Sequence, residues 1–249
     1  MNTEIYWNKT LIRCSSLSSL FTEPQAKADK DAGKLSKTAK AHLIEVYAGE
    51  LWDVEKDIIT KQMQKGIQAE EEALTLLSRV DKKLYIKNQE RFANEWICGH
   101  PDIIQPDEIV DTKVSWSAFT FLPKLVEEVE KDYYYQLQGY LWLTDRFKAR
   151  ISYCLVDTPD NIIQGEKYRL LRSMDVISEE SPEYVAAAKK LESNMRFGHI
   201  PKELRVINHF VDRDESIIEK IPAKVEKARE FLIELHEKHL SLYKTKELI

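Results

Sequence analysis

His100-Pro101-Asp102-Ile103-Ile104 is followed, after a polar turn, by Ile109-Val110-Asp111-Thr112-Lys113, so two short apolar segments carry two carboxylates and one ammonium group. Successive side chains of a strand point to opposite faces, so Asp111 and Lys113 lie on the same face if the second segment is a strand. The intervening Gln-Pro-Asp-Glu favours a turn that folds Asp102 back beside Asp111. The sequence therefore predicts two neighbouring carboxylates with a lysine next to them.

Two carboxylates that are brought together repel each other unless a cation binds between them. A site made of oxygen ligands favours a hard ion, Mg²⁺ or in its place Mn²⁺. Lys113 can then hold a water molecule or a phosphate group beside the ion, which is the minimum equipment for metal-assisted hydrolysis of a phosphodiester bond. The alternative interpretation is a turn residue and two exposed strand charges, which an isolated match would favour.

Two helices add polar side chains to this pattern. The first is predicted over residues 67–80, where Glu70 lies three residues before Ala73 and so belongs to the inward-facing stripe. The second is predicted over residues 132–143 and carries Gln136 and Tyr140 one turn apart on one face. The alternatives are a solvated acidic helix start and an aromatic core helix with a polar end.

The motifs occur in the order that is typical of the lambda-exonuclease-like (YqaJ-type) branch of the PD-(D/E)xK nuclease superfamily, which the sequence resembles over roughly residues 10 to 157. The matching motifs are Gly66-x₃-Glu70-x₂-Ala73, Pro101-Asp102, Asp111-Thr112-Lys113 and Gln136-x₃-Tyr140. The resemblance implies an α/β fold in which a central mixed β-sheet is flanked by helices on both faces, with helical additions at both ends. We expect one domain over residues 1–249, with a core over about 42–212 and a C-terminal helix over about 214–248.

The resemblance also implies the metal ligands. Asp102 and Asp111 would bind one or two Mg²⁺ ions, and the Thr112 carbonyl and Glu70 would complete the ligand shell. The implied reaction is 5′→3′ exonucleolytic hydrolysis of double-stranded DNA ends during phage or prophage recombination.

The remaining catalytic roles follow from the same resemblance. Lys113 would orient or deprotonate the attacking water, and Gln136 with Tyr140 would act beside it. Relatives of this type form rings of three subunits and act with a single-strand annealing protein. The expected partners are therefore further copies of this chain, in a ring of three, and a single-strand annealing protein.

An enzyme that starts at a 5′ end needs a pocket for the terminal phosphate. Arg13, followed by Ser15 and Ser16, resembles the N-terminal part of the pocket in lambda-type enzymes, with a shorter Arg-to-Ser spacing. His100 stands where those enzymes have a serine before Pro-Asp, which is a departure from the pattern. The alternative for the N-terminal residues is helix-cap and surface chemistry.

The composition is ordinary for a globular protein, with 249 residues, 43% hydrophobic and 32% charged. No apolar run reaches the roughly 18 residues of a membrane span, and the first residues do not have the pattern of a signal peptide, so we expect a cytoplasmic protein that does not enter a membrane. Cys14, Cys98 and Cys154 are widely spaced and predict buried thiols, without a disulfide or a zinc site.

The net charge of -5 gives little overall attraction to DNA. Local clusters of basic residues would have to contact the DNA phosphates. The alternative is that these basic residues only form a solvated surface. The candidates are Lys27, Lys30, Lys34, Lys37 and Lys40, and nearer to the motifs Lys82, Lys83, Lys87 and Arg91.

Two other functions compete with the exonuclease. A structure-selective or restriction-like endonuclease could use the same core, and a non-catalytic DNA-binding subunit could retain the fold. The sequence retains all of Glu70, Asp102, Asp111 and Lys113. This argues against the non-catalytic subunit, because a protein without catalysis has no chemical reason to keep every ligand.

Hydrophobic periodicity gives the remaining elements. The expected helices cover residues 42–64, 182–196 and 214–248, and the expected strands cover 84–89, 96–99, 109–114, 149–156 and 204–211. Residues 22–41, rich in lysine and containing Pro24 and Gly33, are expected to be mobile.

Overall fold

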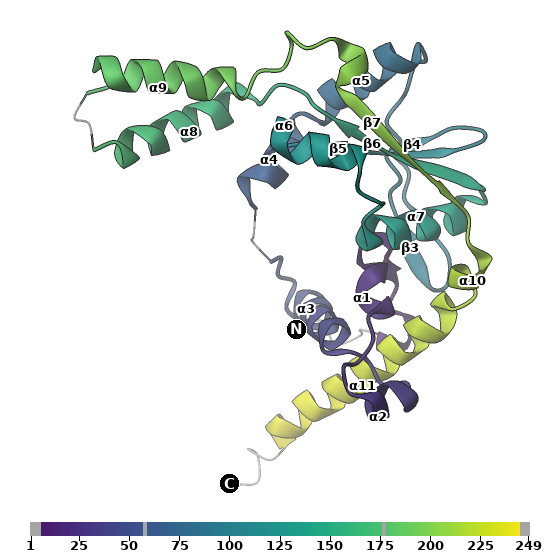
Figure 1. The fold of residues 1–249 in the computed structure, drawn as a ribbon. Coiled ribbons are helices and arrows are strands. Elements are labelled where there is room, and N and C mark those ends of the chain that lie inside the picture. Colours follow the sequence, from purple (N-terminus) through teal and green to yellow (C-terminus); the bar gives the residue numbers. More distant parts are fainter. Residues whose placement is uncertain (1–5, 57–58, 176–177, 245–249) are drawn as a thin grey trace.

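The computed structural model describes residues 6–56, 59–175 and 178–244 and shows an α/β fold with two mixed β-sheets (Figure 1). The larger sheet has the order β4 (Ile103–Ile104), β5 (Ile109–Val114), β6 (Lys148–Cys154) and β7 (Val206–Asp212). The smaller sheet has the order β1 (Ile12–Arg13), β3 (Ile97–Gly99) and β2 (Phe92–Ala93). β5 and β6 are parallel, as are β1 and β3, and the other pairs are antiparallel.

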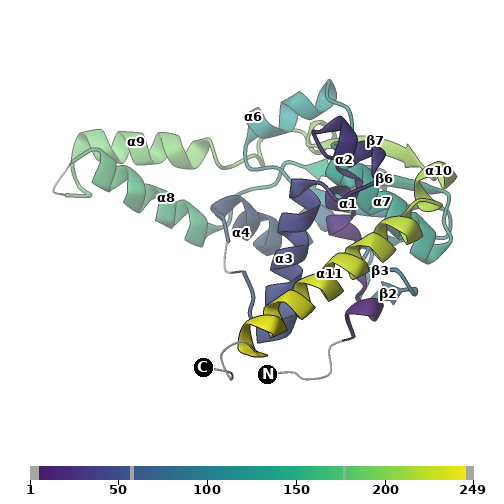
Figure 2. The same cartoon turned by 90° about the horizontal axis from the view of Figure 1, so that it is seen from below.

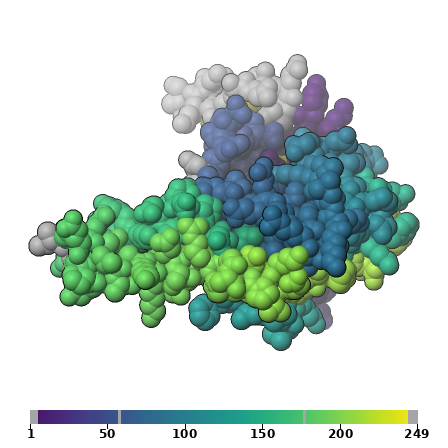
Figure 3. Space-filling model, turned by 90° about the horizontal axis from the view of Figure 1, so that it is seen from above, coloured from purple at the N-terminus to yellow at the C-terminus, as the bar shows by residue number. Residues whose placement is uncertain are grey.

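Helices of very different length surround these sheets. They are α1 (Leu17–Phe21), α2 (Lys27–Asp31), α3 (Lys37–Trp52), α4 (Lys61–Gln68), α5 (Glu70–Asp81), α6 (Ala118–Phe121), α7 (Lys131–Thr144), α8 (Asp160–Ser173), α9 (Pro182–Ser193), α10 (Glu215–Ile218) and α11 (Ile221–Lys244). Single 3-10 turns are η1 (Trp7–Lys9), η2 (Cys14–Ser16), η3 (Leu122–Leu125) and η4 (Lys202–Leu204). α11 crosses α3 in Figure 2, and α8 and α9 form a hairpin that Figure 3 shows as an arm projecting from the body.

The alternation of side chains along the central strands explains why helices cover both faces of the larger sheet. Ile109 and Ile151 are fully buried in one cluster with Leu137 of α7. Val110 is buried in another cluster with Ala73 of α5. Each aliphatic side chain buried in this way stabilises the fold by about 1.5–3 kcal/mol, so both faces hold the strand that carries Asp111 in place.

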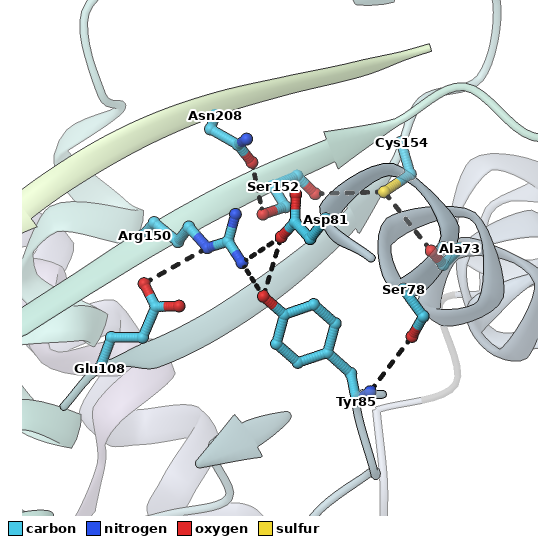
Figure 4. Close-up of polar contacts among 9 residues, drawn as sticks. All are labelled: Ala73, Ser78, Asp81, Tyr85, Glu108, Arg150, Ser152, Cys154 and Asn208. Atoms are coloured by element: carbon cyan, nitrogen blue, oxygen red, sulfur yellow. Dashed lines mark hydrogen bonds and ion pairs between the residues drawn. The ribbon is translucent and has the colours of Figure 1, made fainter. Parts of the chain in front are cut away.

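A buried arginine fixes the segment between α5 and the smaller sheet (Figure 4). Arg150 of β6 donates to Asp81 Oδ2 at 2.6 Å and to the Tyr85 hydroxyl, and its Nε lies 3.4 Å from Glu108 Oε2. Removing one partner of a buried charged group leaves the other uncompensated, which is strongly destabilising. This network therefore ties the end of α5 to the start of β5.

The predicted helix over residues 42–64 is wrong, because two helices occupy this part of the chain. α3 ends at Trp52, and Asp53 adopts the left-handed conformation (φ 52°) that terminates a helix. Thr60 caps the next helix, α4, by accepting a hydrogen bond at its hydroxyl. Residues 57–58 lie outside the described residues.

The predicted strand over residues 84–89 is also wrong. Leu84 and Ile86 are 78% and 73% exposed, whereas Tyr85 between them is buried in the network of Arg150. The apolar run Leu84–Ile86 is thus held by one anchored tyrosine, and the segment pairs with no strand among the described residues.

The other elements agree with the sequence to differing degrees. The strands predicted over residues 96–99, 109–114, 149–156 and 204–211 are confirmed as β3, β5, β6 and β7, and the helices over 132–143 and 182–196 as α7 and α9. Residues 22–41 contain α2 and the start of α3, and their mobility stays a prediction. The helix α8 was not predicted.

The helices predicted over residues 67–80 and 214–248 have other bounds in the structure. The helix predicted over residues 67–80 begins as α5 at Glu70, and Ile67 lies at the end of α4, where it is 67% exposed. The helix predicted over 214–248 is interrupted between α10 and α11, and residues 245–248 lie outside the described part. Within the described ranges, no helix combines the length and the apolar composition needed to cross a bilayer.

Candidate active site

Antiparallel pairing of β4 with β5 places the two predicted carboxylates together. Ile103 is paired with Val110, so the same register sets Asp102 opposite Asp111. The Asp102 Oδ2 accepts hydrogen bonds from the Thr112 backbone N–H (2.8 Å) and the Thr112 hydroxyl (3.1 Å). The turn therefore folds Asp102 back onto β5, as predicted, although strand β3 before it belongs to the other sheet.

Asp111 and Lys113 lie on the same face of β5 and form a close ion pair. Lys113 Nζ lies 2.6 Å from Asp111 Oδ2, and the Asp111 side chain is only 2% exposed. Gln136 of α7 donates through Nε2 to Asp111 Oδ1 (3.2 Å) and to the Tyr140 hydroxyl (2.9 Å). The structure thus brings together six of the residues singled out in the sequence, from the start of β4, from β5 and from α7: Asp102, Asp111, Thr112, Lys113, Gln136 and Tyr140.

Tyr133 was not singled out in the sequence, but it contacts the lysine directly. Lys113 Nζ lies 4.9 Å from the centre of the Tyr133 ring, a cation–π arrangement that restricts where the ammonium group can point. Tyr133 precedes Gln136 by one helical turn of α7, and this i, i+3 spacing was the available signal.

The electrostatics of the site raise the pKa of both Asp102 and Lys113. Burial and the neighbouring charge of Asp111 raise the pKa of Asp102 to about 6, against which the Thr112 hydrogen bonds and Lys113 act. Burial alone would lower the pKa of Lys113, but the attraction of Asp111 and Asp102 outweighs it and raises the pKa to about 12. Lys113 is therefore a charged donor at neutral pH.

Glu70 lies in a different local setting from the one implied by the resemblance. Its Oε2 accepts from Lys87 Nζ at 2.6 Å, and it is the first residue of α5. Among residues 6–56, 59–175 and 178–244, no three His, Cys, Asp or Glu side chains gather in a way that could hold a metal ion. The carboxylates at the candidate site are thus a pair, and the role of Glu70 stays a prediction.

The residues nevertheless fit a hard divalent cation. Asp111 Oδ2 is buried and, apart from its ion pair with Lys113, has no hydrogen-bond partner. Facing carboxylates that raise a pKa gain from a positive charge between them. All available donors are oxygens, which suits Mg²⁺ or Mn²⁺.

The predicted 5′-phosphate residues lie next to this site without bonding to it. Arg13 is exposed and paired with Cys98 across β1 and β3. Ser15 is exposed and Ser16 half-buried in η2, which packs against α7 and β3, and His100 is exposed directly after β3. None of the four, all within the described residues, forms a hydrogen bond with Asp102, Asp111 or Lys113 in the structure, so the pocket stays a prediction.

The N-terminal segment comes close to the site through two glycines. A Cβ atom on Gly139 would lie 2.7 Å from Cys14 Sγ, and one on Gly99 would lie 2.9 Å from it and 2.5 Å from the Tyr140 ring. Only glycine permits this approach. Cys14, Cys98 and Cys154 are buried free thiols, as predicted.

A fully buried lysine beside the end of β5 was also missed. Lys65 of α4 donates to the Trp116 carbonyl at 3.0 Å, and burial lowers its pKa to about 8. The sequence does not reveal this burial, because a lysine in an amphipathic helix normally lies at the surface in contact with water. In the same region Phe121 is buried, whereas Phe119 is 90% exposed.

The chain is similar over nearly its whole length to solved structures of exonucleases. A phage-related exonuclease from Haemophilus somnus 129PT is 30% identical, with a TM-score of 0.73 and coverage of 93% of this chain and 97% of that chain. The alkaline exonuclease LHK-Exo from Laribacter hongkongensis is 13% identical (TM-score 0.61, 98% of both chains). Its complex with dAMP is 14% identical (TM-score 0.58, 96% of this chain and 95% of that chain). No family model and no curated protein matches the chain.

Proposed function

The chain belongs to the lambda-exonuclease-like (YqaJ-type) family, and on that basis we propose that it is a Mg²⁺-dependent 5′→3′ exonuclease that degrades double-stranded DNA from its ends. The observation that carries the proposal is the convergence of Asp102, Asp111, Lys113 and Gln136 at adjoining strands and one helix. The dAMP bound to LHK-Exo supports a nucleotide as the product class.

The proposed reaction is hydrolysis, in which water attacks the phosphorus atom and the sugar oxygen leaves. Asp102, Asp111 and the Thr112 carbonyl would hold Mg²⁺, with Glu70 contributing directly or through water. When bound, Mg²⁺ would supply positive charge that offsets the charge growing on the phosphate oxygens and would acidify the attacking water.

The residues of the chain then position the reactants. Lys113 is charged at neutral pH, so it would orient the attacking water or a phosphate oxygen by donating a hydrogen bond to it. The proton that the attacking water loses would pass to the solvent, and the leaving sugar oxygen would take up a proton from the solvent. Gln136 bonds both Asp111 and Tyr140, which fixes α7 against the carboxylate. Tyr133 restricts the position of the ammonium group through its ring.

Labelled linear and circular duplexes test the activity and its direction. With Mg²⁺, we expect a 5′-labelled linear duplex to release labelled mononucleotide at once, a 3′-labelled one to release its label late, and a covalently closed circle to survive. The physical reason is that a 5′ end must enter the site before the first bond breaks. Cutting of the circle would favour the endonuclease, and binding without cleavage would favour the non-catalytic subunit.

The same family membership carries a proposal about assembly. A ring of three subunits would enclose the DNA and replace affinity that a net charge of -5 does not supply. A single-strand annealing protein would bind the complementary strand that is left single-stranded when the 5′-ended strand is degraded. Light scattering at micromolar concentration is expected to give three times the 29.1 kDa mass of the chain. A single species at the mass of one chain would contradict the ring.

A further inference from the structure

Three lysines of α11 share one face of the helix. Lys220, at the start of the helix, Lys224 and Lys227 follow the i, i+4, i+7 spacing that aligns side chains along one side. The helix packs its Ile221, Val225 and Ala228 side into the core. The acidic residues nearest in sequence, Glu219, Glu226 and Glu230, lie roughly 100° away around the axis, and Glu234, which is on the lysine side, follows Lys227 by about two turns. The part of this face from Lys220 to Lys227 therefore carries lysines without an acidic residue.

Lysines from the N-terminal part of the chain complete this surface. Lys227 Nζ donates to the Gly33 carbonyl at 2.8 Å, so α11 is in contact with the turn after α2. That turn requires glycine, because Gly33 has φ +62° and a Cβ there would lie 2.7 Å from Lys227 Nζ. Figure 1 shows α2 beside α11. The lysine cluster is defined as Lys30, Lys34, Lys40, Lys220, Lys224 and Lys227.

The acidic groups within this cluster do not balance it. Glu23 pairs with Lys30, and Asp29 pairs with Lys34 at 2.8 Å, but all four side chains are about half exposed. Exposed pairs of this kind contribute about 0–1 kcal/mol. Burial and the like charges of Lys227 and Lys220 lower the pKa of Lys224, so the cluster costs free energy that an anionic ligand would recover.

An aromatic bridge connects the lysine cluster to the candidate active site. Lys224 Nζ lies 5.6 Å from the centre of the Phe21 ring, and Phe21 stacks on Tyr135 with ring centres 4.5 Å apart. Tyr135 precedes Gln136, which bonds Asp111. The side chains of Phe21 and Tyr135 therefore connect Lys224 to the N-terminal turns of α7, which also carry Gln136.

We propose that the lysine cluster binds the phosphate backbone of the duplex whose end lies in the active site. The inference rests on the proposed function and extends it by naming a second contact surface for the substrate. A duplex carries regularly spaced phosphates, so its body must run over the surface next to the site, and clustered ammonium groups release counterions when they bind phosphates. This surface would supply the local attraction that the net charge of the chain lacks.

Salt-dependent binding tests the surface. The substitution Lys220→Gln together with Lys224→Gln removes two charges and leaves the Lys227–Gly33 contact intact. Affinity for a 5′-phosphorylated duplex is measured by fluorescence anisotropy over a series of salt concentrations, with Ca²⁺ in place of Mg²⁺. We expect affinity on the order of tenfold weaker, and a slope of log affinity against log salt that is shallower by about 1 to 2, because each lost phosphate contact removes about 0.9.

The matched control is Lys189→Gln with Lys190→Gln, which removes two exposed charges from α9 on the projecting arm. It should bind like the wild type, and the single change Lys220→Gln, at an exposed position, should give about half of the effect on the slope. An unchanged slope in the Lys220/Lys224 variant, or an equal loss in the control, would overturn the inference while wild-type DNA degradation keeps the proposed function intact. A wild-type chain that neither binds nor degrades DNA would overturn both.

Discussion

Replacement of Lys113 by alanine is expected to reduce hydrolysis of linear duplex DNA by about 1000-fold or more. The substitution removes the one ammonium group that contacts Asp111, and with it the donor that positions water or phosphate at the reacting centre. Losing a positioned proton donor or a charge-stabilising donor typically costs 10²- to 10⁴-fold. The measurement is the initial rate of nucleotide release with saturating Mg²⁺.

The control for this substitution is Lys148→Ala, which removes an exposed lysine from the far end of β6 and should leave the rate unchanged. Metal-free Lys113→Ala should also melt at a lower temperature than the wild type, because Asp111 loses its ion pair while it stays buried. Added Mg²⁺ should restore much of that loss. Wild-type activity in Lys113→Ala would rule out the assignment of the site.

The sequence predicts the centre of this site better than its surroundings. β5 alternates β-branched and polar residues, so period 2 alone places Asp111 and Lys113 on one face, and the Pro-containing turn places Asp102 opposite. These are local rules that need no knowledge of distant partners. Gln136 and Tyr140 follow for the same reason, since i, i+4 spacing is fixed within one helix.

Elements whose conformation depends on tertiary partners could not be predicted in this way. The apolar run around Tyr85 gave residues 84–89 the composition of a strand, but the partner of Tyr85 is Arg150 on β6. Lys65 is buried because Trp116 offers a carbonyl, which no local pattern reveals. The ion pair of Glu70 with Lys87 likewise joins residues from separate segments, so only the structure shows it.

Asp102→Asn is expected to abolish cleavage and, at the same time, to stabilise the metal-free protein. Asparagine keeps the shape of the side chain and an oxygen that accepts from Thr112, but it removes the charge that faces Asp111. The pKa of about 6 exceeds the ordinary value of 3.8 by about two units, which corresponds to about 2 to 3 kcal/mol. The variant should therefore gain about this free energy of unfolding at pH 8, measured by denaturant titration with a chelator present.

The pH dependence gives the sign of this effect. The pKa of Asp102 is raised in the folded protein, so the folded state binds the proton more tightly, and the stability conferred by that proton is lost as the pH rises from about 4 through 6. The difference between Asp102→Asn and the wild type should accordingly vanish near pH 4 and reach its full size above pH 6. Asp107→Asn, in the exposed turn, should show no such difference.

Mg²⁺ should stabilise the wild type and not Asp102→Asn, because the carboxylate pair that would bind the cation is present only in the wild type. Equal stability of the two proteins at pH 8 without metal would mean that neither the burial of the Asp102 charge nor its repulsion by Asp111 destabilises the fold, and the argument for a bound cation would lose its electrostatic basis.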